Sequence, residues 1–360
     1  MRLYIGGIVK HSSDSIDSLL ARREAGERLT RQDLARLLES PDWTSIVAAG
    51  HAERNRRHAP DRASYAAFRI VNYTSVCNVG CSFCSFQDSE DSERGYVLSL
   101  DEIVQKTREA KEWGCDAIFL QGGVNPHLPL TYYLDAVSAI RSQGLAVRGF
   151  SPVELVRLAE KEKLPLRELL GILKEAGLSS VPGAGAEILT DRMRQILSPR
   201  KLSMEEWCST MGACHEMGLP GSCNIVFGSS ETTEDLVEHL GALRDQQDRT
   251  GGFQSFIPWI FQAQTKGFPI RHVRSLEYLR LLAASRLFLD NISHVEVSVM
   301  VMGRELAELG LYAGADDVSS VVFEENVLAS RGLKTVRAAE RFLSEAGFVP
   351  QRRSIDHRLM

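Results

Sequence analysis

The sequence contains no apolar run of 18 or more residues, so it predicts no segment that could cross a membrane as a helix. The first 15 residues, MRLYIGGIVKHSSDS, become polar too early for a secretory signal peptide, and we expect a cytoplasmic protein with no membrane partner. Basic charge is also scarce, because 42 Lys and Arg stand against 47 Asp and Glu, for a net charge of −5. That balance argues against a nucleic-acid partner.

Complete disulfide pairing is excluded as well, because the chain has seven cysteines, an odd number. In a cytoplasmic protein, cysteines are more often thiols or metal ligands than disulfides. The rest of the composition is ordinary for a globular protein, with 44% hydrophobic and 25% charged residues over 360 positions. We therefore expect an ordered protein with a sizeable core, in which the spacing of the cysteines is the most informative feature.

The pattern of apolar residues changes along the chain. Residues 14–58 carry leucines at helical spacing, and Thr30 with Asp33 resembles a capping box. From residue 67 onward, short β-rich runs alternate with longer amphipathic segments, which is typical of β/α units around a parallel sheet. Ser99, Ser151 and Ser203 mark helix starts by the S-x-x-E relation. The β-rich runs are residues 67–72, 117–120, 146–150, 179–181, 222–227, 254–258, 295–301 and 318–323.

Eight such units predict an α/β fold, a (β/α)8 TIM-type barrel with an N-terminal helical extension. Pro60 breaks the helical pattern before the first run. We therefore divide the chain into a helical extension (1–62), a barrel (63–335), and a C-terminal helix and tail that pack on the barrel (336–360).

Cys77, Cys81 and Cys84 form a C-x3-C-x2-C string directly after the first run. This position predicts a loop on the C-terminal face of the barrel, where the active sites of such barrels lie. Thiolates are the ligands that iron–sulfur clusters require, and three of them leave one iron of a 4Fe–4S cluster without a protein ligand. That iron can be chelated by the amino and carboxylate groups of S-adenosylmethionine (SAM).

A structural zinc site is an alternative interpretation of the same cysteines. It would need a fourth ligand, and zinc cysteines usually come as two C-x2-C pairs. Cys115, Cys208, Cys214 and Cys223 are scattered without that spacing, and we expect them to be buried small hydrophobic residues. A non-catalytic zinc or iron–sulfur binding module therefore stays open as the hypothesis of another class.

With its cysteine string placed after the first strand, the chain resembles the radical SAM superfamily, and the resemblance implies a 4Fe–4S cluster and SAM as cofactors. It places Phe83, before the last cysteine, near the adenine. Gln121, Gly122 and Gly123 stand where the family has its G-G-E motif, with Val124 in place of the glutamate. The other cofactor-binding residues that the resemblance implies are Ser151, Glu187, Arg194, Val226 and Phe227.

Longer strings narrow the resemblance to the futalosine-pathway and deazaflavin-forming enzymes. They include NYTSVCNVGCSFCSF, FSPVELV, SVPGAGAEIL and IPWIFQ. They are most similar to the cyclic dehypoxanthine futalosine synthase family of menaquinone biosynthesis. That resemblance implies a nucleoside-like small-molecule substrate, hydrogen abstraction from its ribose, closure of a ring onto its benzoate group, and an electron donor such as flavodoxin or ferredoxin.

Several residues depart from the family pattern near the expected substrate site. Val124 and Arg148 stand where the family has histidines, Gly149 stands where it has an alanine, and the fifth run carries Asn224. A sibling enzyme, either aminofutalosine synthase-like or a natural-product paralogue with another nucleoside-like substrate, is therefore the alternative. We expect catalytic roles for Arg148, Asn224 and Glu324, and Arg148 could pair with a substrate carboxylate. Further polar candidates are His127, Gln262 and Arg304.

Overall fold

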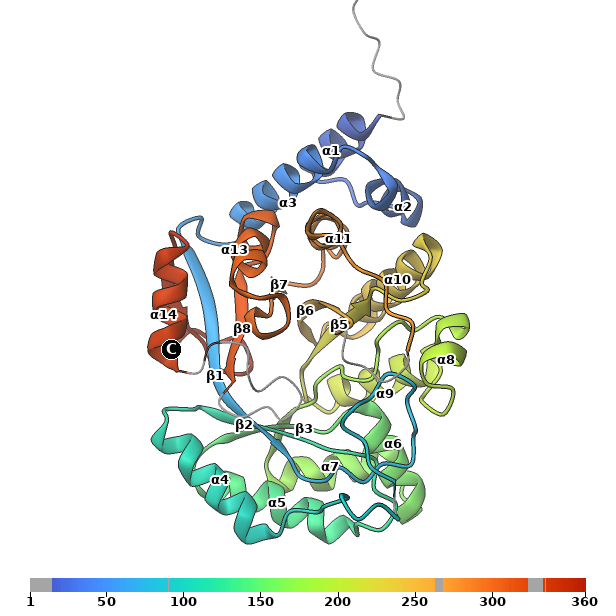
Figure 1. Cartoon of the computed structure of the whole chain (residues 1–360), viewed down its shortest axis with the longest axis vertical. Helices are drawn as coiled ribbons and strands as arrows, with labels where there is room; N and C mark the ends of the chain where they lie inside the picture. Colours follow the sequence, from blue (N-terminus) through green and yellow to red (C-terminus); the bar gives the residue numbers. More distant parts are fainter. Residues whose placement is uncertain (1–14, 90, 263–267, 323–332, 334) are drawn as a thin grey trace, which may run out of the picture.

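A computed structural model describes residues 15–89, 91–262, 268–322, 333 and 335–360. Within these residues, parallel strands form a ring and helices cover its outside (Figure 1). The strands are β1 (Arg62–Asn72), β2 (Ala117–Gln121), β3 (Ala146–Gly149), β4 (Leu178–Ser180), β5 (Gly221–Phe227), β6 (Phe253–Ile260), β7 (His294–Val295), β8 (Asp317–Val322) and β9 (Val349–Arg352). The helices are α1 (Ile16–Glu24), α2 (Arg31–Glu39), α3 (Trp43–Arg57), α4 (Leu100–Glu112), α5 (Leu130–Ser142), α6 (Pro152–Glu162), α7 (Leu166–Ala176), α8 (Asp191–Leu197), α9 (Met204–Glu216), α10 (Thr233–Thr250), α11 (Ser275–Phe288), α12 (Val299–Met302), α13 (Arg304–Ala313) and α14 (Val336–Glu345).

The ring is built from two parallel sheets. One has the strand order β4-β3-β2-β1-β8, and the other has the order β5-β6-β7. Two parallel bridges join the sheets, Val181 with Gly221 and Glu296 with Asp317. The (β/α)8 barrel expected from the sequence is therefore confirmed, and among the described residues each of its two seams consists of one bridge pair, against two or more register pairs between its other neighbouring strands.

One wall of the barrel interior is apolar. Phe68 and Ile70 of β1 cluster there with Phe119 of β2 and with Ile355 of the C-terminal tail. Successive side chains of a strand point to opposite faces. Arg69 accordingly turns outward, where its Nη1 donates to the Lys106 carbonyl on α4 at 2.6 Å.

Helix caps lie where the sequence predicts them. Capping boxes are present at Thr30, Ser99, Ser151 and Ser203, and in each the acidic side chain three residues later reaches back to the cap. Each box satisfies backbone N–H groups that a helix start leaves without a partner. None of the described helices is long and apolar enough to span a membrane.

The N-terminal extension packs closely on the barrel. Helices α2 and α3 lie against α10, α11 and α13 (Figure 1). Gly50 of α3 permits the close approach, because a Cβ there would lie 2.6 Å from the Ala313 carbonyl oxygen and 2.8 Å from the Ala283 Cβ. The buried Arg54 guanidinium donates to the carbonyls of Ala59 and Pro60 and so fixes the entry into β1.

The C-terminal tail enters the base of the barrel. β9 pairs in parallel with the first four residues of β1. Beyond it, Arg353 Nε donates to Asp317 Oδ2 at 2.5 Å, and its Nη2 lies 3.4 Å from Glu296 Oε1. Ile355 then packs among the apolar interior residues, and His357 Nε2 lies 3.1 Å from Glu296 Oε1. The tail is thus a floor of the barrel.

Three expectations differ from the observed elements. Of the seventh run, 295–301, only Val295 lies in the two-residue strand β7, because the Ser298 hydroxyl accepts from the Val301 N–H and begins α12. A short apolar run cannot distinguish strand from helix by periodicity. β1 begins at Arg62, earlier than expected, and β9 was not predicted at all. The division at residues 62 and 335 stays a proposal.

We expect Gly50→Leu to lower the free energy of unfolding by about 1–3 kcal/mol, because the larger side chain would push α3 away from α11 and α13. The control is Ala48→Leu, at an exposed position of the same helix, which should change stability by less than about 0.5 kcal/mol. Thermal and denaturant unfolding measure both. Equal stability of the two variants would show that the extension does not pack as described.

Candidate active site

The loop after β1 holds Cys77, Cys81 and Cys84, and backbone bonds fix its path. The Cys77 N–H donates to the Asp88 carbonyl at 3.0 Å. The Ser82 N–H donates to the Leu197 carbonyl, also at 3.0 Å, at the end of α8. Arg200 Nε donates to the Val79 carbonyl at 2.8 Å. The loop is therefore held from both sides.

The three thiols line one cavity of about 240 Å³, which we call the cysteine cavity. Cys81 is 7% exposed, and burial raises the pKa of its thiol to about 11. The nearby Cys77 and Cys84 thiols raise this pKa further, whereas Lys201 lowers it. Binding to iron would compensate for the cost of holding deprotonated thiols there. The donor set and the cavity thus fit a cluster with three cysteine ligands.

Gly122 and Gly123 let the end of β2 lie against this loop. A Cβ on Gly123 would lie 2.2 Å from the Val76 carbonyl oxygen, and one on Gly122 would lie 2.8 Å from the Tyr73 ring. Both glycines line the cysteine cavity, together with Ser151 and Glu154 at the start of α6. Glu154 accepts from the Tyr73 hydroxyl at 2.6 Å. The glycines expected to bind SAM therefore border the thiols.

Glu187 links two cations beside the thiols. Lys201 Nζ lies 2.8 Å from Glu187 Oε1, and Arg194 Nη1 lies 3.2 Å from Glu187 Oε2. Lys201 lines the cysteine cavity and lies over the Phe83 ring, 5.2 Å from its centroid. Arg194 is buried, and its Nε and Nη2 find no hydrogen-bond partner in the described part of the chain. These buried donors could be satisfied by an anionic ligand.

A second cavity, of about 370 Å³, occupies the barrel axis, and we call it the barrel pocket. Its lining is largely apolar, with Phe68, Ile70 and Phe119 on one wall. Glu296 and Arg353 mark its base. It adjoins the cysteine cavity, since the two share the lining residues Cys84, Phe86, Phe119, Gln121, Pro182 and Ala184. We call the two adjoining cavities together the chamber.

Residues predicted from the sequence fall into different places. Phe83, Val226, Asn224, Gln262 and Arg148 line the barrel pocket, and Gln121 lines both cavities. The Phe227 side chain points to the opposite face of β5, where it is fully buried and stacks on Tyr278 of α11 at 6.3 Å. Phe227 lines neither cavity, unlike its neighbour Val226, and its cofactor-binding role stays a prediction. Arg304 lies on the outside of the barrel, paired with Glu345 at 2.8 Å.

Two of the predicted site residues, Glu324 and His127, are not found in either cavity of the described structure. Glu324 lies outside the residues that the structure describes. His127 lines neither of the two cavities, and its backbone N–H donates to Asn125 Oδ1 at 2.9 Å.

Several residues of the chamber were missed by the sequence reasoning. Lys201 stands in the string SPRKLS, where it reads as a surface residue. Trp259 lines the barrel pocket, and its Nε1 finds no hydrogen-bond partner in the described residues. Glu296 and Arg353 come from the seventh strand region and the tail. The alternation of inward and outward side chains along β6 could have indicated Trp259. No local sequence pattern marks Lys201, Glu296 or Arg353 as site residues.

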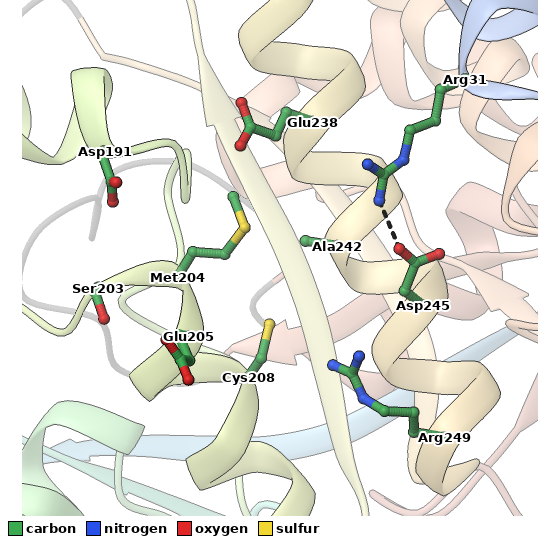
Figure 2. Close-up of a pocket in the computed structure, with 10 residues that line it drawn as sticks. All are labelled: Arg31, Asp191, Ser203, Met204, Glu205, Cys208, Glu238, Ala242, Asp245 and Arg249. Atoms are coloured by element: carbon green, nitrogen blue, oxygen red, sulfur yellow. Dashed lines mark hydrogen bonds and ion pairs between the residues drawn. The ribbon is translucent and has the colours of Figure 1, made fainter.

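Another cavity of about 370 Å³ lies outside the barrel between α8, α9 and α10 (Figure 2). Its lining is charged, and Arg31 pairs with Asp245 across one side at 2.5 Å. The Cys208 thiol is buried there, and burial raises its pKa to about 11, which makes it unreactive. None of the residues predicted from the sequence as site residues lines this cavity.

Two protein-family models match this chain. The model of the radical SAM superfamily matches residues 71–243, which include the cysteine loop. The model of the CofH/MqnC C-terminal region matches residues 250–359, which include β6 and the tail.

Similar proteins cover nearly the whole chain. Cyclic dehypoxanthine futalosine synthase of Halalkalibacterium halodurans is 36% identical over 96% of this chain and 95% of its own. The Streptomyces coelicolor enzyme of the same name is 36% identical over 89% and 82%. Aminodeoxyfutalosine synthase of Thermus thermophilus is 33% identical over 92% of both chains.

Two solved structures share the fold at low sequence identity. Methylornithine synthase PylB matches with a TM-score of 0.72 and 18% identity over 93% of this chain and 97% of its own. The FeFe-hydrogenase maturase HydG of Carboxydothermus hydrogenoformans matches with a TM-score of 0.72 and 14% identity over 95% and 80%. The sequence relatives, the fold and the cysteine cavity agree: the chain belongs to the radical SAM superfamily, whose enzymes use a 4Fe–4S cluster and S-adenosylmethionine.

Proposed function

We propose that this enzyme removes a hydrogen atom from the ribose of a nucleoside-like substrate and closes a ring; two of its relatives are named cyclic dehypoxanthine futalosine synthase. One observation carries the proposal: the cysteine cavity adjoins an apolar pocket on the barrel axis, and the two share lining residues. A substrate in that pocket would lie beside the cofactor site and away from bulk water.

The residues of the cysteine cavity divide the work of holding the cofactors. When bound, the cluster and SAM supply a 5′-deoxyadenosyl radical. Cys77, Cys81 and Cys84 would hold three irons. Backbone groups of Gly122 and Gly123 would contact the methionyl part of SAM. Arg194 lines neither cavity, and its unsatisfied nitrogens carry the proposed contact with the methionyl carboxylate.

The barrel pocket would hold and shield the substrate. Its apolar wall and the tail at its base would keep water away from the substrate radical. Asn224 and Trp259 offer polar atoms on the other wall. We also propose a cytoplasmic location and a flavodoxin- or ferredoxin-type electron donor, since the reaction needs one electron for each SAM cleaved.

The cluster assignment is tested with Cys77→Ala. We expect this variant to lose the visible absorbance of a 4Fe–4S cluster after anaerobic reconstitution with iron and sulfide, and to lose reductive SAM cleavage. Cys115→Ala is the matched control, because Cys115 is a buried cysteine whose pKa burial raises to about 12. A cluster that survives in Cys77→Ala would overturn the assignment of the ligands.

The reaction itself is tested with dehypoxanthine futalosine that carries deuterium in its ribose, together with SAM and a reductant. We expect the label in 5′-deoxyadenosine and a cyclised product, both measured by mass spectrometry. An adduct that retains the adenosyl group would instead indicate a reaction like that of aminodeoxyfutalosine synthase. Unlabelled 5′-deoxyadenosine without a cyclised product would reject this substrate.

A further inference from the structure

Arg148 of β3 is a buried cation with few partners. Its side chain lines the barrel pocket, and the residue is 5% exposed. Nε donates to Ser180 Oγ at 3.1 Å, and Nη2 donates to the Ile355 carbonyl at 2.7 Å. Burial lowers the pKa of this guanidinium to about 10, so it stays charged at neutral pH. Both of its partners are neutral groups.

The neighbouring acids are already engaged by another arginine. Arg353 contacts Asp317 with both Nε and Nη2, at 2.5 and 2.8 Å, and lies 3.4 Å from Glu296. Arg148 forms no ion pair with a carboxylate in the part of the chain that the structure describes. Glu296 and Asp356 attract the Arg148 guanidinium without forming an ion pair with it, so its burial is only partly compensated. A bound anion in direct contact would compensate it further.

The position of Arg148 along the barrel axis distinguishes the two ends of the barrel pocket, the floor and the end next to the cysteine cavity. In the strand register, Arg148 pairs with Phe119, and Phe119 pairs with Ile70, two residues before β1 ends. Nη2 reaches down to the tail that forms the floor. The cysteine cavity lies at the other end, beyond Gln121. The backbone of Arg148 is thus level with Phe119, which also lines the cysteine cavity, but its guanidinium extends from there toward the floor.

We propose that Arg148, held by Ser180 and by the tail carbonyl of Ile355, is an anion site that binds the carboxylate of an aryl carboxylate substrate. The aromatic ring then lies against Phe68, Ile70 and Phe119, and the sugar end of the substrate points toward the cysteine cavity. This inference rests on the proposed function, because it assigns an orientation to the substrate of that reaction.

The opposite wall supplies polar atoms at the height that a sugar would occupy. Asn224 Oδ1 is a buried acceptor and Trp259 Nε1 a buried donor, and both lack a hydrogen-bond partner in the described residues. Asn224 pairs in register with Ile257, and Val226 pairs with Trp259, so the two polar groups follow each other along the axis. A hydroxyl group can satisfy a donor and an acceptor together.

The anion site is tested without turnover by ligand-detected NMR with two probes, benzoate and benzamide, which differ in charge but little in shape. We expect wild-type protein to bind benzoate about tenfold to a hundredfold more tightly than benzamide, because a guanidinium–carboxylate bond is charge-assisted. Arg148→Gln should lose this preference. Arg304→Gln, which removes an exposed arginine from the outside of the barrel, should retain it.

Each outcome decides the proposal. An unchanged preference in Arg148→Gln, or no preference in wild-type protein, overturns it. If Arg148→Gln fails to fold, as judged by circular dichroism and thermal unfolding, the comparison of the two probes on wild-type protein and on Arg148→Lys decides instead. Turnover is measured in a separate assay. Failure to convert dehypoxanthine futalosine would reject the proposed function, whereas the preference for benzoate over benzamide tests the anion site independently of turnover.

Discussion

The barrel depends on one buried arginine at its base. Arg353 bonds to Asp317 on β8, lies beside Glu296 after β7, and donates its backbone N–H to the Tyr65 carbonyl on β1 at 2.9 Å. It therefore crosses the seam where Glu296 and Asp317 form a single backbone bridge. Removing one partner of a buried ion pair typically costs about 3–5 kcal/mol, because a charge is left without compensation. Closure of the barrel and the floor of its pocket thus share one interaction.

Much of the architecture could be predicted because it follows from local patterns. The capping boxes at Ser99, Ser151 and Ser203 form with neighbours three residues away, and strand-like runs before the helices predict parallel β/α units. The cysteine loop follows the first strand, so its place on the barrel is set by strand direction alone. Gly122 and Gly123 border the thiols for the same reason, since they end the neighbouring strand.

The rest could not be predicted because it depends on contacts between distant segments. The tail residues after β9 are polar and read as surface, yet Arg353 and Ile355 lie inside the barrel. Lys201 approaches the thiols only because Glu187 and Phe83 hold it there. Strand alternation alone predicts that Phe227 faces away from Val226 and the site, as observed, whereas the family motif includes both residues. Motifs indicate the cofactors, whereas tertiary contacts shape the substrate pocket.

The cofactor end and the substrate end of the chamber thus come from different parts of the chain, with the thiols in the loop after β1 and the floor in the tail. The most direct test of this account is an anaerobic crystal structure with the cluster, SAM and the substrate bound. The account predicts the substrate in the barrel pocket, with its carboxylate on Arg148 and its sugar next to SAM. A substrate in the outer cavity between α9 and α10, or one bound in the reverse direction, would contradict it.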